Sequence, residues 1–198
     1  MVARVHGVPP VPPPPFGTSG GAAPASPPPA ASTPVSETAV LASTGAGPNR
    51  NCPNVATFKI SANKRLSQGR GALNAYLNNP KETFAQIRTA GRQLADARDG
   101  WNALKRTLDE FATGWNNCLP PGGRWSEEAS FEYEVFFRAA AALARDIEAG
   151  RGNSRSADVI ASLLSQLDLG AVWTTTTASV FMGLLNAIAA RLSPRGAF

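Results

Sequence analysis

The sequence has a single histidine and only two cysteines among its 198 residues, and this scarcity excludes several kinds of site. His6 alone cannot supply a Ser/His/Asp or Cys/His catalytic arrangement or an HExxH zinc site. Cys52 and Cys118 are too few for a disulfide framework or a four-thiolate metal site; they fit a reducing compartment, and the sequence leaves open whether they meet. The nucleotide-binding motifs GxxxxGK(S/T) and complete GxGxxG are also missing. The chain is therefore predicted to be neither an enzyme nor the holder of a cofactor.

The N-terminus lacks the uninterrupted apolar core of a secretory signal. One uncharged segment, residues 169–190, matches a bilayer span in its length of 22 residues. However, the threonines at 174–177 together with Gly183 and Asn186 make it only modestly hydrophobic. This segment predicts a helix that is buried or lies at an interface, and no membrane partner.

Proline divides the chain into two parts. Of the 17 prolines, 12 lie before residue 51, and that stretch carries only Arg4, Glu37 and Arg50 as charges. A segment of this composition cannot bury enough apolar surface to offset the entropy lost on ordering, so residues 1–50 are predicted to be a disordered arm. Residues 51–198 carry 17 Lys and Arg against 13 Asp and Glu. This mild positive excess in the expected folded domain permits contact with nucleic acid.

Apolar spacing after residue 50 predicts a mainly helical domain. Apolar residues recur every three or four positions from 80 to 115, with Asn79-Pro80 opening the helix and Asp99-Gly100 as the break between two antiparallel helices. Alternation over 131–135 predicts a short half-buried strand, and 55–60 is a second β-like stretch. The expected fold is a bundle of four or five helices with a small β element. Further helices are expected at 136–149, ended by Gly150, at about 156–167 and at about 178–192.

The four tryptophans fall into two pairs. Trp101 and Trp115 lie on the apolar stripe of the expected helices, which is typical of core residues. Trp125 and Trp173 follow loop or polar sequence, and for these two we expect a place at an interface.

Two groups of basic residues are candidates for phosphate binding. Arg145, Arg151 and Arg155 surround the loop RGNSR beside the start of an expected helix, where guanidinium groups and exposed N–H groups both favour an anion. For each group the alternative is a solvated basic surface without a ligand. The second group consists of Lys64, Arg65 and Arg70.

Several stretches occur in a suggestive order: Ser67-Gln68, Tyr76, Asn79-Pro80, Phe111 and Trp115, Arg124-Trp125, residues 131–136, and residues 170–173. Together they resemble the coat proteins of rod-shaped, tobamovirus-like plant viruses. Those proteins have, in the same order, an aromatic pair four residues apart, a loop to an Arg-aromatic pair, and a short strand that leads into the next helix. The similarity covers about residues 67–173 with small gaps, and it rests on spacing more than on identity.

The resemblance implies a structural subunit, found in the virion and the host cytoplasm, that forms a four-helix bundle and assembles helically around single-stranded RNA. The positions that match RNA contacts are Arg155 and Asp158 at the start of the fourth helix, with Arg145 and Arg151 toward the inner loop. Cationic side chains neutralise phosphates without reading bases, so such packaging is largely independent of sequence.

The resemblance also implies carboxylate pairs between subunits, with weak calcium binding, whose repulsion drives disassembly when calcium or protons are lost. Glu127 and Glu128 are the first candidates, and Glu148 with Asp158 is the second. The chain departs from the family because residues 111–115 contain no acid where the family usually has one.

Two further departures are the long Pro-rich arm and an additional apolar helix after residue 173. The arm also keeps a second hypothesis open, in which the protein is a cytosolic helical adaptor whose Pro-rich arm recruits a partner domain and needs neither RNA nor assembly. Deletion of residues 1–50 separates the two hypotheses, because a coat protein keeps its assembly and an adaptor loses its partner.

Overall fold

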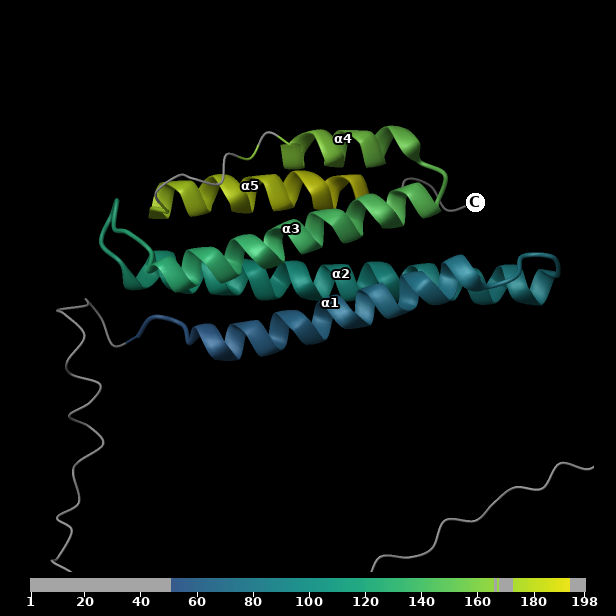
Figure 1. Cartoon of the computed structure of the whole chain (residues 1–198), viewed down its shortest axis with the longest axis horizontal. Coiled ribbons are helices and arrows are strands. Elements are labelled where there is room, and N and C mark those ends of the chain that lie inside the picture. Colours follow the sequence, from purple (N-terminus) through teal and green to yellow (C-terminus); the bar gives the residue numbers. More distant parts are fainter. Residues whose placement is uncertain (1–50, 166, 168–172, 193–198) are drawn as a thin grey trace, which may run out of the picture. The chain divides into compact units, whose positions relative to one another are not determined.

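The structure, a computed structural model, describes residues 51–165, 167 and 173–192, all within one compact unit that spans Ala46–Phe198. These residues form helices and no strand, with one isolated bridge between Arg124 and Thr174. The prediction of a mainly helical domain is confirmed; the small β element is not seen, and a bundle of four helices is not confirmed. The helices are α1 (Val55–Asn78), α2 (Phe84–Cys118), α3 (Glu127–Gly150), α4 (Ser154–Ser165) and α5 (Thr175–Leu192) (Figure 1). The expected disordered arm, residues 1–50, lies outside the described residues.

Both stretches expected to be strands are helical. The 131–135 stretch lies inside α3, whose N-cap Ser126 accepts a hydrogen bond from the Ala129 N–H. Phe131 and Val135, four residues apart, share an exposed face, whereas Glu132 is buried and pairs with Lys59 of α1. The alternation of apolar and charged residues at 131–135 therefore does not mark a strand: the apolar Phe131 and Val135 lie on the exposed face of a helix, and the charged Glu132 lies on its buried face. The 55–60 stretch likewise begins α1.

Helix α2 runs for 35 residues without the break expected at Asp99-Gly100. It also begins later than expected, because Thr83 and Gln86 form a capping box instead of a cap at Asn79. Gly100 is buried where α2 crosses α1, and a Cβ there would lie 2.7 Å from the backbone of Gly69. This glycine therefore permits a close helix crossing instead of ending the helix.

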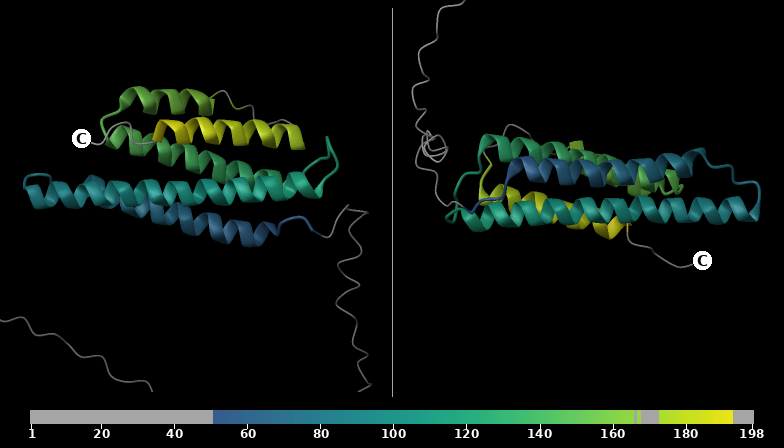
Figure 2. Two further views of the ribbon diagram at one scale, coloured as in Figure 1. Left: turned by 180° about the vertical axis from the view of Figure 1, so that it is seen from behind. Right: turned by 90° about the horizontal axis from the view of Figure 1, so that it is seen from below.

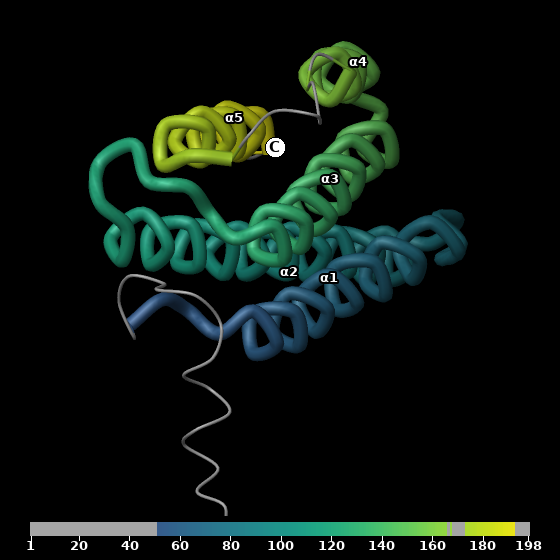
Figure 3. The backbone as a smooth tube through the Cα atoms, turned by 60° about the vertical axis from the view of Figure 1, so that its left-hand side comes forward, coloured from purple at the N-terminus to yellow at the C-terminus, as the bar shows by residue number. Residues whose placement is uncertain are grey.

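The helices form two layers joined by α3. Helices α1 and α2 form an antiparallel hairpin, and α3 packs across both (Figure 2). Helices α4 and α5 lie on the side of α3 that faces away from α1, with α5 also in contact with α2 (Figure 3). The core runs between these layers along α2 from Ala90 through Trp101 to Phe111.

One end of this core is an aromatic cluster around the C-terminal part of α2. Trp125 and Trp173, expected at an interface, are 5% and 8% exposed and belong to it, with Trp125 donating a hydrogen bond to Asn116. Burial, with the nearby Asp109 carboxylate, raises the pKa of the Tyr133 hydroxyl well above its usual value. The aromatic cluster consists of Phe58, Phe111, Trp115, Trp125, Tyr133, Trp173 and Phe181.

A disulfide between Cys52 and Cys118 closes the same end of the molecule. It ties the residues just before α1 to the last residue of α2, across 66 positions of sequence. The interpretation that these cysteines fit a reducing compartment conflicts with this bond, because disulfides persist in oxidising environments.

Helix α5 covers most of the uncharged segment expected to be buried, although residues 169–172 of that segment lie outside the described residues. Phe181, Leu185 and Ile188 bury one face of α5 against the other helices. Among the described helices, none is long and apolar enough to cross a membrane.

Candidate nucleic-acid interface

The α3–α4 turn, residues 148–156, carries two of the predicted phosphate-binding arginines, Arg151 and Arg155. Helix α3 ends at Gly150, as expected, and Gly152 adopts a φ of +78°, a left-handed conformation that glycine accepts without strain. Asn153 then caps α4, because its backbone oxygen accepts from the Ala157 N–H and its side-chain oxygen from the Ser156 N–H at 3.4 Å. The chain thus reverses direction within three residues, of which Arg151, the C-cap of α3, is the first.

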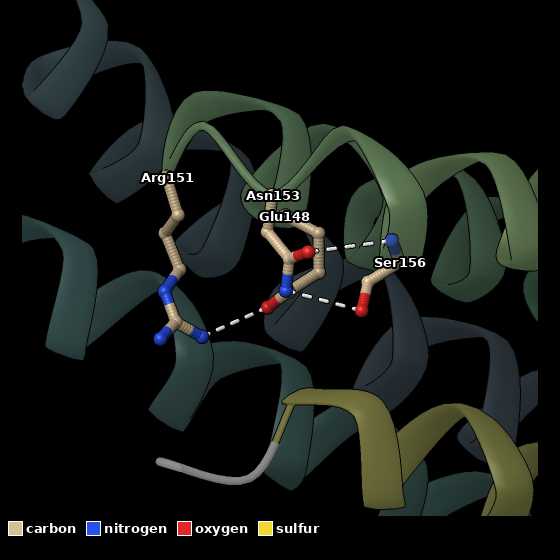
Figure 4. A network of polar contacts seen from close by, with 4 residues as sticks. All are labelled: Glu148, Arg151, Asn153 and Ser156. Carbon is tan, nitrogen blue, oxygen red and sulfur yellow. Dashed lines mark hydrogen bonds and ion pairs between the residues drawn. The ribbon is translucent and has the colours of Figure 1, made fainter. Parts of the chain in front are cut away.

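Glu148 holds this turn together from inside the protein (Figure 4). Its side chain has no exposed surface. One carboxylate oxygen accepts from Arg151 Nη1 at 2.9 Å, and the other accepts from Asn153 Nδ2 at 2.7 Å. The Asn153 backbone N–H donates to the Glu148 carbonyl oxygen at 2.9 Å. A buried carboxylate with both oxygens occupied cannot face another subunit, so the predicted intersubunit role does not fit Glu148, which instead orients Arg151 and Asn153.

The other residues predicted to contact RNA lie near this turn but make no hydrogen bond to Glu148, Arg151 or Asn153. Arg145 is exposed and pairs with its neighbour Asp146, with Nε donating to Oδ1 at 2.9 Å. Arg155 and Asp158 are both exposed at the start of α4, and among the described residues neither takes part in an ion pair. The structure therefore brings Arg151 to Glu148 and leaves Arg155 and Asp158 open to solvent.

Arg151 also faces the loop between α1 and α2, which sequence reasoning did not identify as part of a site. It lines a pocket of about 290 Å³ together with residues of both helices. The Tyr76 hydroxyl donates to the Gly150 carbonyl oxygen at 2.9 Å and so fixes α1 against the end of α3. Lys81 Nζ lies 4.4 Å from the centre of the Tyr76 ring. We call residues 76–94 the hairpin tip. The pocket is lined by Tyr76, Lys81, Ile87, Ala90, Gly91, Leu94 and Arg151.

The second basic group does not form a patch. Arg65 lines a pocket between α1 and α2 beside Glu110, whereas Arg70 lines pockets between α1 and α3, one of them beside Asp146. Lys64 is exposed on the outer face of α1. These three cations point in different directions, because residues adjacent in a helix lie 100° apart.

Glu127 and Glu128 are exposed in the first turn of α3, at the opposite end of that helix from the α3–α4 turn. Carboxylates are favourable there because they lie at the positive end of the helix dipole. They have no described ion-pair partner within the subunit, so both remain candidates for contact with another subunit. Within the part of the chain that the structure describes, no three acidic, histidine or cysteine residues are grouped to hold a metal ion.

No family model, no curated protein and no solved structure matches this chain. A functional argument therefore depends on the residues and their geometry.

Proposed function

We propose that the protein is a structural coat subunit that assembles helically and packages single-stranded RNA through phosphate contacts. The observation that carries the proposal is the α3–α4 turn, where the buried Glu148 fixes Arg151 next to the exposed residues 152–155. A guanidinium group held by one of its donors keeps the others available for a phosphate oxygen. Arg155 is exposed four residues after Arg151 and takes part in no ion pair of the described residues, whereas Arg145 is exposed and pairs with Asp146.

Self-association is supported by large apolar side chains that the single subunit leaves exposed. They occur on three different helices, and contact between subunits gives this surface a place to be buried. The exposed side chains away from the α3–α4 turn are Ile60 on α1, Phe131 and Val135 on α3, and Val180 on α5.

Negative-stain electron microscopy of the purified protein, with and without ribonuclease, tests the proposal. Rods or filaments that protect RNA from the nuclease are the expected result. A monodisperse monomer without nucleic-acid absorbance at both acidic and neutral pH would contradict it.

Replacement of Arg151 and Arg155 by alanine tests the RNA contacts directly. On a single strand, the slope of log affinity against log salt falls by about 0.7 for each phosphate that the protein no longer neutralises. Because R151A also removes a partner of the buried Glu148, R155A alone serves as the variant that leaves the network intact. The matched control is the double variant K64A/R106A, which removes two exposed cations away from the turn. An unchanged slope for both R155A and R151A/R155A, measured by fluorescence anisotropy with oligouridine, excludes these arginines from the RNA site.

A further inference from the structure

The most exposed aromatic ring of the described chain lies at the hairpin tip. Phe84 is the first residue of α2 and is 74% exposed. The helix does not need it for capping, because Thr83 and Gln86 satisfy the capping box between themselves. Leu77 and Ile87, on either side of the loop, are also exposed. Packing within the subunit therefore does not explain the phenylalanine at this position.

The neighbours of Phe84 alternate apolar and cationic groups along one face of α2. Arg88 lies one turn farther on, with its guanidinium carbon 5.0 Å from the centre of the Phe84 ring. Gly91 follows on the same face, and a Cβ there would meet nothing within 4 Å. Ile87 and Leu94 border this face and line the pocket that contains Arg151. The ring thus has a cation beside it and is itself largely exposed, on the helix that also lines this pocket.

The charge at the hairpin tip favours an anionic ligand. Lys81, Arg88 and Arg92 are exposed, and none of them takes part in the ion pairs of the described residues. Glu82 is the one acid within residues 76–94, and Asp96 follows just beyond them. Arg151 lines the same pocket, so the α3–α4 turn lies beside the hairpin tip.

We propose that the hairpin tip is a stacking site for the bases of single-stranded RNA, with Phe84 as the stacking residue and Arg88 and Lys81 as contacts for the flanking phosphates. This inference rests on the proposed function and adds a second element to it, because the α3–α4 turn supplies phosphate contacts without an exposed ring. Every base has a π-face, so stacking on Phe84 contributes affinity without selecting a sequence. Lys81 Nζ also donates to the carbonyl oxygens of Tyr76 at 3.1 Å and Asn79 at 3.4 Å, which fixes this ammonium group at the tip. An apolar surface between protein subunits would not require this concentration of cations outside ion pairs.

Binding of a short oligouridine, about eight nucleotides long and within the site size of single-strand binding proteins, tests the proposal on the full-length chain. We expect F84A to weaken binding about 10-fold and to leave the salt slope unchanged, because stacking releases no counterions. F84W should restore the affinity. R88A should lower the slope by about 0.7. The matched control is Q68A, which removes an exposed uncharged side chain of α1 that lies outside the hairpin tip and outside the apolar surface proposed for self-association, and it should leave the affinity unchanged.

Sedimentation of the same variants separates the outcomes. If the wild-type protein binds no oligouridine, both the proposed function and this inference are overturned. If the wild type binds and F84A binds equally well, the stacking site is overturned while the proposed function stands. If F84A changes the state of assembly and not the affinity for RNA, the hairpin tip is a contact between subunits, which also overturns the stacking site.

Discussion

The two ends of the α1–α2 hairpin use the same kinds of side chain in opposite ways. At the C-terminal end of α2, the aromatic cluster is packed ring against ring and closed by the Cys52–Cys118 disulfide. At the hairpin tip, about 50 Å away along a helix of 35 residues, Phe84 is exposed beside Arg88. Aromatic residues therefore stabilise one end and remain available for a ligand at the other. The comparison indicates that the rings that stabilise the fold and the residues proposed to bind RNA are separated along a single helix.

The largest expected effect comes from opening the aromatic cluster. Phe111 is 4% exposed and its ring contacts those of Phe58, Trp115, Trp125 and Tyr133. F111A should lower the free energy of unfolding by about 3–5 kcal/mol in urea denaturation, because it leaves a cavity in the core. F84A is the matched control and should change it by less than about 0.5 kcal/mol. Equal losses for the two variants would show that both rings stabilise the fold.

Removal of the disulfide should have the next largest effect. The variant C52S/C118S frees a loop of 66 positions in the unfolded chain, and we expect a loss of about 2–4 kcal/mol in the free energy of unfolding. The affinity for oligouridine should not change, since both cysteines lie at the end of α2 that is remote from the hairpin tip. A weaker affinity in this variant would mean that the two ends are coupled.

Glu148 stabilises the α3–α4 turn, and we expect its replacement to change the free energy of unfolding less than F111A or loss of the disulfide. E148Q keeps one acceptor and places an amide donor against either Arg151 or Asn153, so we expect a loss of about 1–3 kcal/mol in the free energy of unfolding. Hydrogen exchange should increase first at residues 148–156, because the network orders this turn. If exchange in the turn stays as slow as in the wild type, Glu148 does not hold it.

The smallest effect is expected at the first turn of α3. Glu127 and Glu128 lie at the positive end of the helix dipole, so E127Q and E128Q should each lower the stability of the isolated subunit by about 0.3–1 kcal/mol. In assemblies the sign should reverse, with E127Q/E128Q particles persisting at alkaline pH where the wild type dissociates. Turbidity followed against pH measures this, and identical curves would remove both carboxylates from the disassembly switch.

Sequence reasoning predicted the features that depend on local signals. The end of α3 at Gly150 and the basic loop around Arg151 follow from helix propensity, glycine and charge. The predictions were wrong where contact with a residue distant in the sequence determines the local structure or the burial of a side chain. Gly100 resembles a helix break until Gly69 is known to cross it, and Glu132 resembles a solvent-facing strand residue until Lys59 is known to pair with it.

The candidate site was predicted in part for the same reason. Arg151 and Arg155 lie in a loop that its glycine and polar residues identify in the sequence. The burial of Glu148 depends on tertiary packing, which no local sequence pattern indicates. The hairpin tip was missed although it carries a signal. Phe84 and Arg88, one helical turn apart, place an aromatic ring and a cation on the same face of α2.

Photo-cross-linking to RNA that contains 4-thiouridine, followed by mass spectrometry of the linked peptides, tests the separation of the two ends most directly. The account predicts linked peptides from residues 76–94 and 145–158. The aromatic cluster is the internal control, because it holds more aromatic rings than the hairpin tip. If the number of rings alone determined cross-linking, the linked peptides would come from this cluster. Linked peptides confined to residues 111–133 would contradict the account. So would a complex with RNA in which no linked peptide comes from residues 76–94 or 145–158.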